Sequence, residues 1–104
     1  MVIEWLKVRV DEQWRERYVQ IDEEIWTAAL ARYPGFLGKE IWLSPSHPDE
    51  VIMIIQWATR EQWKAIPAAD LKLIEQQFDQ ALGTRDYKIV EEKEFVVRKF
   101  ARQG

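Results

Sequence analysis

Cysteine is absent from the 104 residues, so the chain forms no disulfide bond and offers no thiolate for catalysis or metal binding. Asparagine is also absent, and the single histidine is His47. No apolar run approaches the roughly 20 residues that a membrane-spanning helix needs. The first ten residues are typical of a strand rather than of a signal peptide. We therefore expect a cytoplasmic protein with no membrane segment and no metal centre.

The chain carries a small excess of negative charge, with a net charge of −3 at neutral pH. An acidic protein is poorly suited to the phosphate backbone of nucleic acid, so we expect no nucleic-acid partner. Arg98, Lys99 and Arg102 form a short basic end, which we expect to contact another subunit. A chain of 104 residues has room for one hydrophobic core, and we predict a single domain over residues 1–104.

Val51–Trp57 is a strongly apolar stretch and predicts a strand that is buried on both faces. Apolar side chains fall on both parities of this strand, which is typical of a strand in the middle of a sheet. Thr59 and Gln62 follow at the spacing of a capping box, in which two side chains satisfy free backbone N–H groups. We therefore predict that the strand ends at Trp57 and that a helix begins near Arg60.

The other elements are predicted from apolar periodicity and from the positions of proline and glycine. The first strand covers Val2–Val10, and an amphipathic helix follows from Asp11 to about Arg32. Whether Asp22–Glu24 marks a kink or a new start of this helix stays open. The remaining predictions are a strand over Phe36–Ser44, a polar turn over Ser44–Glu50, a helix over about Asp70–Leu82 and a strand over Tyr87–Phe100.

The predicted order of elements is β-α-β-β-α-β, the ferredoxin-like α+β pattern with a four-stranded antiparallel sheet. The first and third strands, apolar on both faces, are expected at its centre, and the charged second and fourth strands at its edges. Both helices cover one face of such a sheet, so the other face needs a second cover. We predict a homodimer that packs sheet against sheet, a dimeric α/β barrel. The alternative is a monomer that covers this face with its own C-terminal segment.

Two short motifs resemble the antibiotic biosynthesis monooxygenase-like proteins of the dimeric α/β-barrel group. They are Tyr33-Pro-Gly-Phe36, after the first helix, and Trp57-Ala-Thr-Arg-Glu-Gln-Trp63, after the central strand. The order of elements is similar over nearly the whole chain. The resemblance implies a pocket between the sheet and the helices. It also implies a cofactor-free oxygenase of polycyclic aromatic substrates, a haem-degrading enzyme or a small protein of unknown role.

The functional residues of that family transfer poorly to this chain. Its better-known active members rely on an asparagine from the first strand, and the sequence contains none. The haem-degrading branch needs a histidine on the second helical segment, and residues 59–83 contain none. We therefore expect no cofactor and assign no catalytic residue, and whether the protein is an enzyme stays open.

Aromatic side chains are the main candidates for a ligand site, because six tryptophans are unusual in a chain of this length. Large rings favour a flat apolar guest through stacking and burial. Trp14, Trp26, Trp57 and Trp63 either line such a pocket or belong to an ordinary core. The residues that we predict to contact a ligand are Trp26, Tyr33, Trp57, Trp63 and Phe78.

Three hypotheses of function remain. The first is a homodimer that binds a small apolar or aromatic molecule, with cofactor-free oxygenase chemistry as its enzymatic version. The second is a non-catalytic binding or sensing module on the same scaffold. The third is an interaction protein whose pocket is packed core.

Other reactive side chains are predicted to be solvated. His47 and the two serines of the turn Ser44–Glu50 are expected to form the turn rather than to act as catalysts. The acidic side chains within Glu91–Glu94 alternate between the two faces of a strand, which does not favour a paired acid site.

Lys7 and Arg9 share one face of the first strand with Trp5. Their charges either bind a carboxylate or phenolate oxygen of a ligand or lie on the surface. Which face of this strand lines the pocket stays open.

Overall fold

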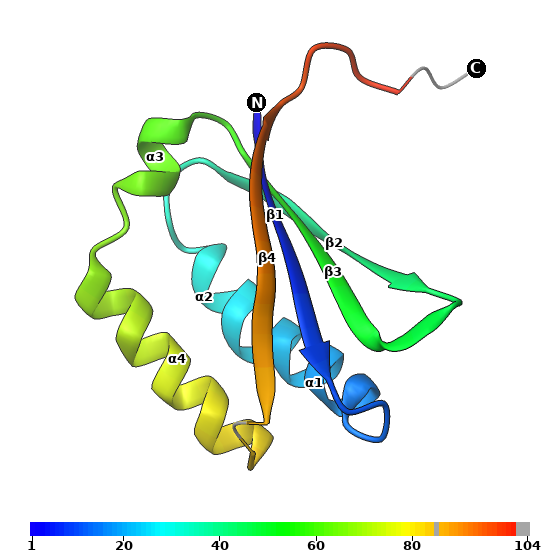
Figure 1. Cartoon of the computed structure of the whole chain (residues 1–104). Coiled ribbons are helices and arrows are strands. Elements are labelled where there is room, and N and C mark those ends of the chain that lie inside the picture. The colour runs from blue at the N-terminus through cyan, green and yellow to red at the C-terminus, as the bar shows by residue number, and fades with distance from the viewer. Residues whose placement is uncertain (85, 102–104) are drawn as a thin grey trace.

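A computed structural model describes residues 1–84 and 86–101 and places four strands in one antiparallel sheet. The strands are Val2–Val10 (β1), Phe36–Ser44 (β2), His47–Trp57 (β3) and Tyr87–Val96 (β4). The helical segments are Arg15–Asp22 (α1), Glu23–Thr27 (η1), Ala28–Leu30 (α2), Arg60–Lys64 (α3) and Ala68–Leu82 (α4). Figure 1 shows the helices gathered on one side of the sheet.

The strands follow the order β2-β3-β1-β4 across the sheet, which confirms the ferredoxin-like fold with β1 and β3 at its centre. Val8 of β1 pairs with Val51 of β3, and Leu6 pairs with Met53. Val8, Val51 and Met53 are buried in the cluster that includes α1 and α4, so the even-numbered residues of β1 face the helices. Trp5 and the other odd-numbered residues face away, which answers the question that the sequence left open.

The first long helix continues through Asp22–Glu24, so it does not restart there, one of the two possibilities that the sequence left open. It runs from Arg15 to Leu30, and its middle section, η1, is a π-helical turn. A π-helical turn closes with i→i+5 hydrogen bonds and so contains one residue more than an α-helical turn. The helix ends at Leu30 rather than at the predicted Arg32.

The hairpin between β2 and β3 is tighter than predicted. Ser44 lies opposite His47, so β3 begins four residues before the predicted start at Val51. Pro48 is tolerated there because a proline near the first residue of a strand removes no inner ladder hydrogen bond.

β4 is shorter than predicted and ends at Val96 rather than at Phe100. The backbone N–H of Val97 donates to the carbonyl oxygen of Met1 at 3.0 Å. This hydrogen bond is the last contact between the two strands, because residues beyond Val97 run away from the sheet (Figure 1).

The last helix, α4, begins at Ala68, two residues before the predicted Asp70. Pro67 precedes it in an extended conformation, and Asp70 lies in the first turn, where the helix dipole favours a negative charge. Gly83 ends the helix with a φ of 86°, a conformation that glycine adopts without steric cost.

The capping box predicted at the start of α3 forms on its threonine side. Thr59 Oγ1 accepts a hydrogen bond from the backbone N–H of Gln62 at 3.1 Å. The side-chain oxygen of Gln62 accepts from the Thr59 hydroxyl at 3.2 Å instead of reaching back to the backbone.

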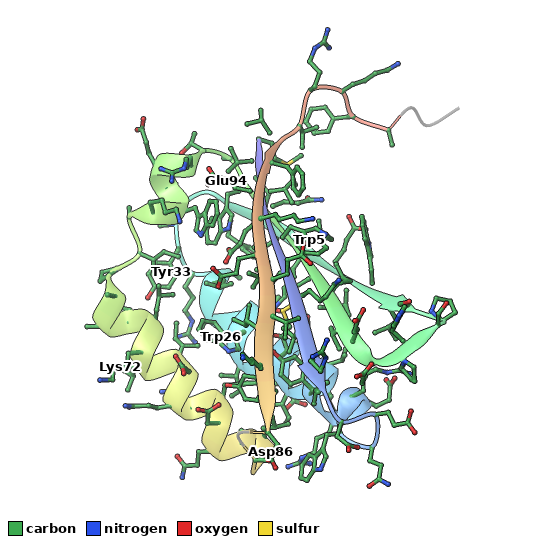
Figure 2. The ribbon with its side chains drawn as sticks, in the orientation of Figure 1. Trp5, Trp26, Tyr33, Lys72, Asp86 and Glu94 are labelled. Atoms are coloured by element: carbon green, nitrogen blue, oxygen red, sulfur yellow. The ribbon has the colours of Figure 1, made fainter. Side chains whose placement is uncertain are left out.

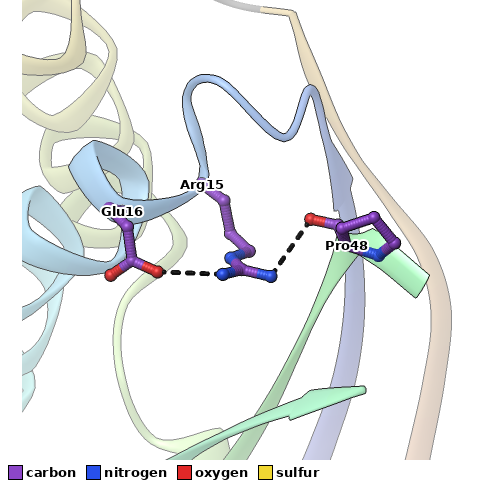
Figure 3. Close-up of polar contacts among 3 residues, drawn as sticks. All are labelled: Arg15, Glu16 and Pro48. Carbon is purple, nitrogen blue, oxygen red and sulfur yellow. Dashed lines mark hydrogen bonds and ion pairs between the residues drawn. The ribbon is translucent and has the colours of Figure 1, made fainter. Parts of the chain in front are cut away.

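Arg15 ties the start of the first helix to the β2–β3 hairpin, which lies at the same end of the sheet (Figure 3). Its Nη1 donates to the carbonyl oxygen of Pro48 at 3.3 Å, and its Nη2 contacts Glu16 Oε1 at 3.1 Å. The start of α1 is therefore held against the start of β3.

The sheet face that points away from the helices carries several apolar side chains. Trp42 and Phe95 are 51% and 49% exposed, whereas Ile54 is buried between its neighbours. Residues 97–101 run past the end of the sheet and do not fold back over it (Figure 1). Within the described residues, no helix is long and apolar enough to cross a membrane.

Candidate functional site

A cavity of about 370 Å³ lies between the sheet and the helices. Its floor consists of apolar side chains from the two central strands, Leu6 and Val8 of β1 and Met53 and Ile55 of β3. In the antiparallel register Leu6 lies opposite Met53, and Ile55 is the next residue of β3 on the same face. The two central strands therefore present a group of apolar side chains to the cavity.

One wall of the cavity is formed by the first long helix. Tyr18, Asp22, Trp26 and Leu30 all line it, at a regular spacing of four residues. An ideal α-helix has 3.6 residues per turn, so side chains at this spacing drift around its axis. The π-helical turn Glu23–Thr27 contains an extra residue, which offsets that drift and keeps all four side chains on one face.

A buried ion pair lies in this wall. Lys39 of β2 donates to Asp22 Oδ2 at 2.5 Å, and both side chains are only 3% exposed. Burial raises the pKa of the Asp22 carboxyl above its usual value, although Lys39 acts in the opposite direction. The pair gives the apolar cavity a polar region that is shielded from water.

A second carboxyl group enters the cavity from the sheet. Glu4 of β1 lies among apolar residues of the same parity, and its Oε1 accepts a hydrogen bond from Trp57 Nε1 at 3.1 Å. Burial raises the pKa of Glu4, while the hydrogen bond from Trp57 and the nearby charges of Lys39 and Lys64 lower it in part.

The remaining polar groups of the lining come from the last two helices and from β4. Lys64, Glu75 and Glu92 border the cavity and are exposed to solvent. Lys64 Nζ lies 4.1 Å from the centre of the Trp63 ring, a cation–π contact. Deeper in the cavity, burial raises the pKa of the Tyr18 phenol, and the negative charge of Asp22 raises it further.

The structure brings two of the five predicted ligand-contacting residues to the cavity. Trp26 and Trp63 line it, and Figure 2 shows Trp26 between α4 and the sheet. Trp57 and Phe78 are fully buried behind the lining. Tyr33 donates a hydrogen bond to Asp70 at 2.8 Å and packs against the core. Ligand contact by these residues stays a prediction.

The fourth tryptophan of the predicted set, Trp14, packs against the core at the start of α1 and is not part of the cavity lining. His47 is exposed on the hairpin, and its Nδ1 lies 3.2 Å from the hydroxyl oxygen of Ser44. Ser46 is exposed beside it. Among the described residues, no cluster of three or more His, Cys, Asp or Glu side chains has the arrangement of a metal site.

The charged residues that share a face with Trp5 lie on the opposite side of the sheet from the cavity. Lys7 pairs with Glu91 at 3.4 Å, and Lys93 lies 5.0 Å from the centre of the Trp5 ring. Arg9 pairs with Asp49 at 3.8 Å.

The acidic side chains of β4 have separate surroundings. Glu91 pairs with Lys7 and Lys93 on the outer face, Glu94 pairs with Arg60, and Glu92 lines the cavity. The hydrogen bond from Lys93 lowers the pKa of Glu91. In the basic C-terminal segment Arg98 and Lys99 are exposed, while Arg102 lies outside the described residues.

Sequence reasoning missed the polar part of the cavity, namely Glu4, Asp22 and Lys39. Each had a signal in the sequence. Glu4 is the one charged residue among the even-numbered residues of β1, which are otherwise apolar. Asp22 lies four residues from both Tyr18 and Trp26 on an otherwise apolar helix face. A charged residue such as Lys39 within a strand indicates an edge strand, which β2 is, but the Lys39 side chain is buried.

The sequence profile of the antibiotic biosynthesis monooxygenase family matches residues 1–70, about two thirds of the chain. The chain belongs to this family. Comparison with curated proteins gives no match. The family assignment agrees with the resemblance found in the Tyr33–Phe36 and Trp57–Trp63 motifs.

Solved structures with a similar fold include an oxygenase, a monooxygenase and a heme-degrader. SnoaB, a cofactor-independent oxygenase from Streptomyces nogalater, has a TM-score of 0.70 at 14% identity, with 98% of this chain and 97% of that chain covered. The monooxygenase ActVA-Orf6 of Streptomyces coelicolor, in complex with nanaomycin D, has a TM-score of 0.70 at 14% identity, with coverage of 99% and 92%. The heme-degrader MhuD from Mycobacterium tuberculosis, with two hemes in its active site, has a TM-score of 0.70 at 17% identity, with coverage of 98% and 100%. At such low identity these similarities establish the fold alone.

Proposed function

We propose that this family member binds a small, mostly apolar and aromatic molecule in the cavity between the sheet and the helices. The observation that carries the proposal is the lining of that cavity, where Trp26 and Trp63 meet the apolar floor of the sheet. Its volume of about 370 Å³ falls within the range of small-molecule pockets. Aromatic walls favour a flat guest because ring contacts add to the burial of apolar surface.

The enzymatic form of this proposal is a cofactor-independent monooxygenase. Family membership supports it, and so does the fold shared with SnoaB, described as a cofactor-independent oxygenase. The fold shared with a monooxygenase in complex with nanaomycin D supports an aromatic ligand.

A second candidate is a binding or sensing module without catalysis. The chain has no asparagine, and its single histidine, His47, lies on an exposed hairpin and is not part of the cavity lining. The residues expected of the better-known active members are therefore not available, which favours binding without turnover.

The test is a titration of the purified protein with a hydroxyanthrone, followed by tryptophan fluorescence and by oxygen uptake. Leu71 lines the cavity and Leu73 is 56% exposed on the same helix, so Leu71→Trp and Leu73→Trp form a matched pair. Because a larger ring at position 71 occupies the cavity, Leu71→Trp is expected to weaken binding and Leu73→Trp to leave it unchanged. Equal affinities in both variants would refute binding in the cavity.

Oxygen uptake separates the two candidate functions. Uptake that depends on both hydroxyanthrone and protein, and that is lost in Leu71→Trp, supports the monooxygenase. Saturable quenching without oxygen uptake supports the binding module.

We also propose that the functional unit is a cytoplasmic homodimer joined through the outer face of the sheet. Trp42 and Phe95 are half exposed on that face, and burying such side chains contributes roughly 1.5–3 kcal/mol each when they begin fully exposed. Sedimentation at micromolar concentration is expected to give twice the mass of 12.5 kDa. Trp42→Asp is expected to dissociate the dimer. Leu73→Asp changes a similarly exposed apolar residue on a helix and is expected to leave the dimer intact. A monomeric wild type would contradict the proposal.

A further inference from the structure

Glu4 is placed where it can meet a ligand directly. Its neighbours of the same parity on β1 are Val2, Leu6 and Val8, so this face of the strand is otherwise apolar. The Glu4 side chain lines the cavity, half-buried, in the floor that Leu6 and Val8 also form. A carboxyl group in such surroundings needs hydrogen-bond partners, because water is largely excluded.

Trp57 supplies one of those partners from behind the cavity. Its indole ring is fully buried and its Nε1 donates to Glu4 Oε1 at 3.1 Å. Phe36 packs edge-on against the ring, with 5.6 Å between ring centres, which helps to fix its orientation. Within the described part of the chain, Glu4 accepts no other hydrogen bond, so Oε2 is available to a guest.

The charges around Glu4 determine which guests are compatible with it. The cavity is lined by four carboxylates and two lysines, namely Glu4, Asp22, Glu75, Glu92, Lys39 and Lys64. Lys39 is already paired with Asp22 at 2.5 Å. Lys64 stacks on Trp63 at the exposed rim. A guest with a neutral hydrogen-bond donor is therefore favoured over one that brings a carboxylate into the cavity.

The geometry points to Glu4 as the residue that selects the ligand, by accepting a hydrogen bond from a neutral hydroxyl on an aromatic ring. Trp57 is a positioning residue, which holds the Glu4 carboxylate from behind the cavity lining. This inference rests on the proposed function, because it requires that an aromatic molecule enters the cavity. It adds that a phenol binds better than the same ring without a hydroxyl.

A pair of probes of nearly equal shape tests the selection in the wild-type protein. The probes are para-nitrophenol and para-nitroanisole, which differ in that a methyl group replaces the phenolic proton. We expect the phenol to bind about tenfold or more tightly below its own pKa, since hydrogen bonds to charged groups are the stronger ones. Equal affinities would overturn the role of Glu4 and leave cavity binding intact. Binding of neither probe would refute the proposed function and this inference together.

The variant Glu4→Gln tests the residue itself. We expect it to bind para-nitroanisole as the wild type does and to lose the preference for para-nitrophenol. Glu61→Gln is the charge-matched control, because Glu61 is exposed on α3 and does not line the cavity. Retention of the preference in Glu4→Gln would overturn the inference, and retained para-nitroanisole binding shows that the cavity is still folded.

The absorbance of para-nitrophenol gives a second readout, because only its phenolate absorbs strongly in the visible range. A nearby carboxylate disfavours that phenolate, so the pKa of the bound phenol is expected to rise above that of the free phenol. Glu4→Gln is expected to abolish this shift. No shift in the wild type would contradict the contact with Glu4.

Trp57→Phe tests the positioning role. The hydrogen bond from Trp57 lowers the pKa of Glu4, so its loss is expected to raise that pKa further. The acid limb of the pH profile for para-nitrophenol binding then moves to higher pH, while para-nitroanisole affinity shows no such limb. A purely structural role of Trp57 would weaken both probes equally and leave the profile in place, and that result would overturn the assignment.

Discussion

The buried ion pair between Lys39 and Asp22 leads to the most demanding prediction. The variant Lys39→Met keeps an unbranched side chain of similar length and removes the positive charge. Both partners are 3% exposed and their N–O distance is 2.5 Å, so Asp22 would remain as a buried carboxylate without its counter-ion. Removing one member of a buried pair destabilises a protein by about 3–5 kcal/mol.

The loss is expected to depend on pH, because Asp22 can escape it by taking up a proton. Burial already raises the pKa of Asp22 above 3.8, and Lys39 is the main influence that opposes the rise. In Lys39→Met the pKa of folded Asp22 therefore rises further. A carboxyl whose pKa is higher in the folded than in the unfolded state gives stability at low pH, and this stability is lost as the pH rises through the folded pKa. The difference between variant and wild type is thus largest at neutral pH and smaller in acid.

Urea unfolding at about pH 5 and about pH 8 measures both effects. Lys93→Met serves as the control, because Lys93 is 50% exposed and pairs with Glu91 at 2.7 Å on the surface. Exposed pairs contribute about 1 kcal/mol or less. The double variant Asp22→Asn with Lys39→Met is expected to recover most of the stability, because no unpaired charge remains. The reasoning is refuted if Lys39→Met loses no more stability than Lys93→Met at the higher pH.

Three further predictions concern the same scaffold. Thr59→Ala removes the cap of α3, in which Thr59 Oγ1 accepts a hydrogen bond from the Gln62 backbone N–H at 3.1 Å. In urea titrations we expect it to lower the free energy of unfolding by about 1 kcal/mol. An unchanged unfolding midpoint would contradict the role of this cap. Gly35 has a φ of 91° and an added Cβ would lie 2.4 Å from the Gln62 side chain, whereas Gly83 has a φ of 86° and open space around it. Gly35→Ala is therefore expected to cost about 2 kcal/mol or more and Gly83→Ala about 1 kcal/mol, and similar losses would argue against the close contact. Burial raises the pKa of Glu4 above 4.5. As the pH rises from acid to neutral, the wild type is therefore expected to lose stability relative to Glu4→Gln. A gain in the relative stability of the wild type would contradict the direction of this pKa shift.

The fold was largely predictable because its signals are local and repeated. Val51–Trp57 is apolar on both parities, and the structure places it in the inner strand β3. Thr59 marks the start of a helix, and Gly83 its end. The end of β4 was not predictable in this way, since it depends on pairing with β1, a strand far away in the sequence.

The site was predictable only in part, because periodicity indicates burial and not what a buried residue faces. Trp26 and Trp57 lie on apolar faces in the sequence, yet Trp26 borders the cavity and Trp57 is enclosed behind Glu4. The Asp22–Lys39 pair joins a helix to an edge strand, and no local pattern links the two residues. The sequence indicated the π-helical turn that directs Asp22 inward only as a stretch in which the course of the helix stayed open.

The central claim is that a small aromatic molecule occupies the cavity beneath the helices. A crystal structure of the protein grown with para-nitrophenol tests it most directly. The account predicts density for the ring beside Trp26 and Trp63, with its hydroxyl oxygen within hydrogen-bond distance of Glu4. An empty or collapsed cavity at saturating probe, or density only on the outer face of the sheet, would contradict it.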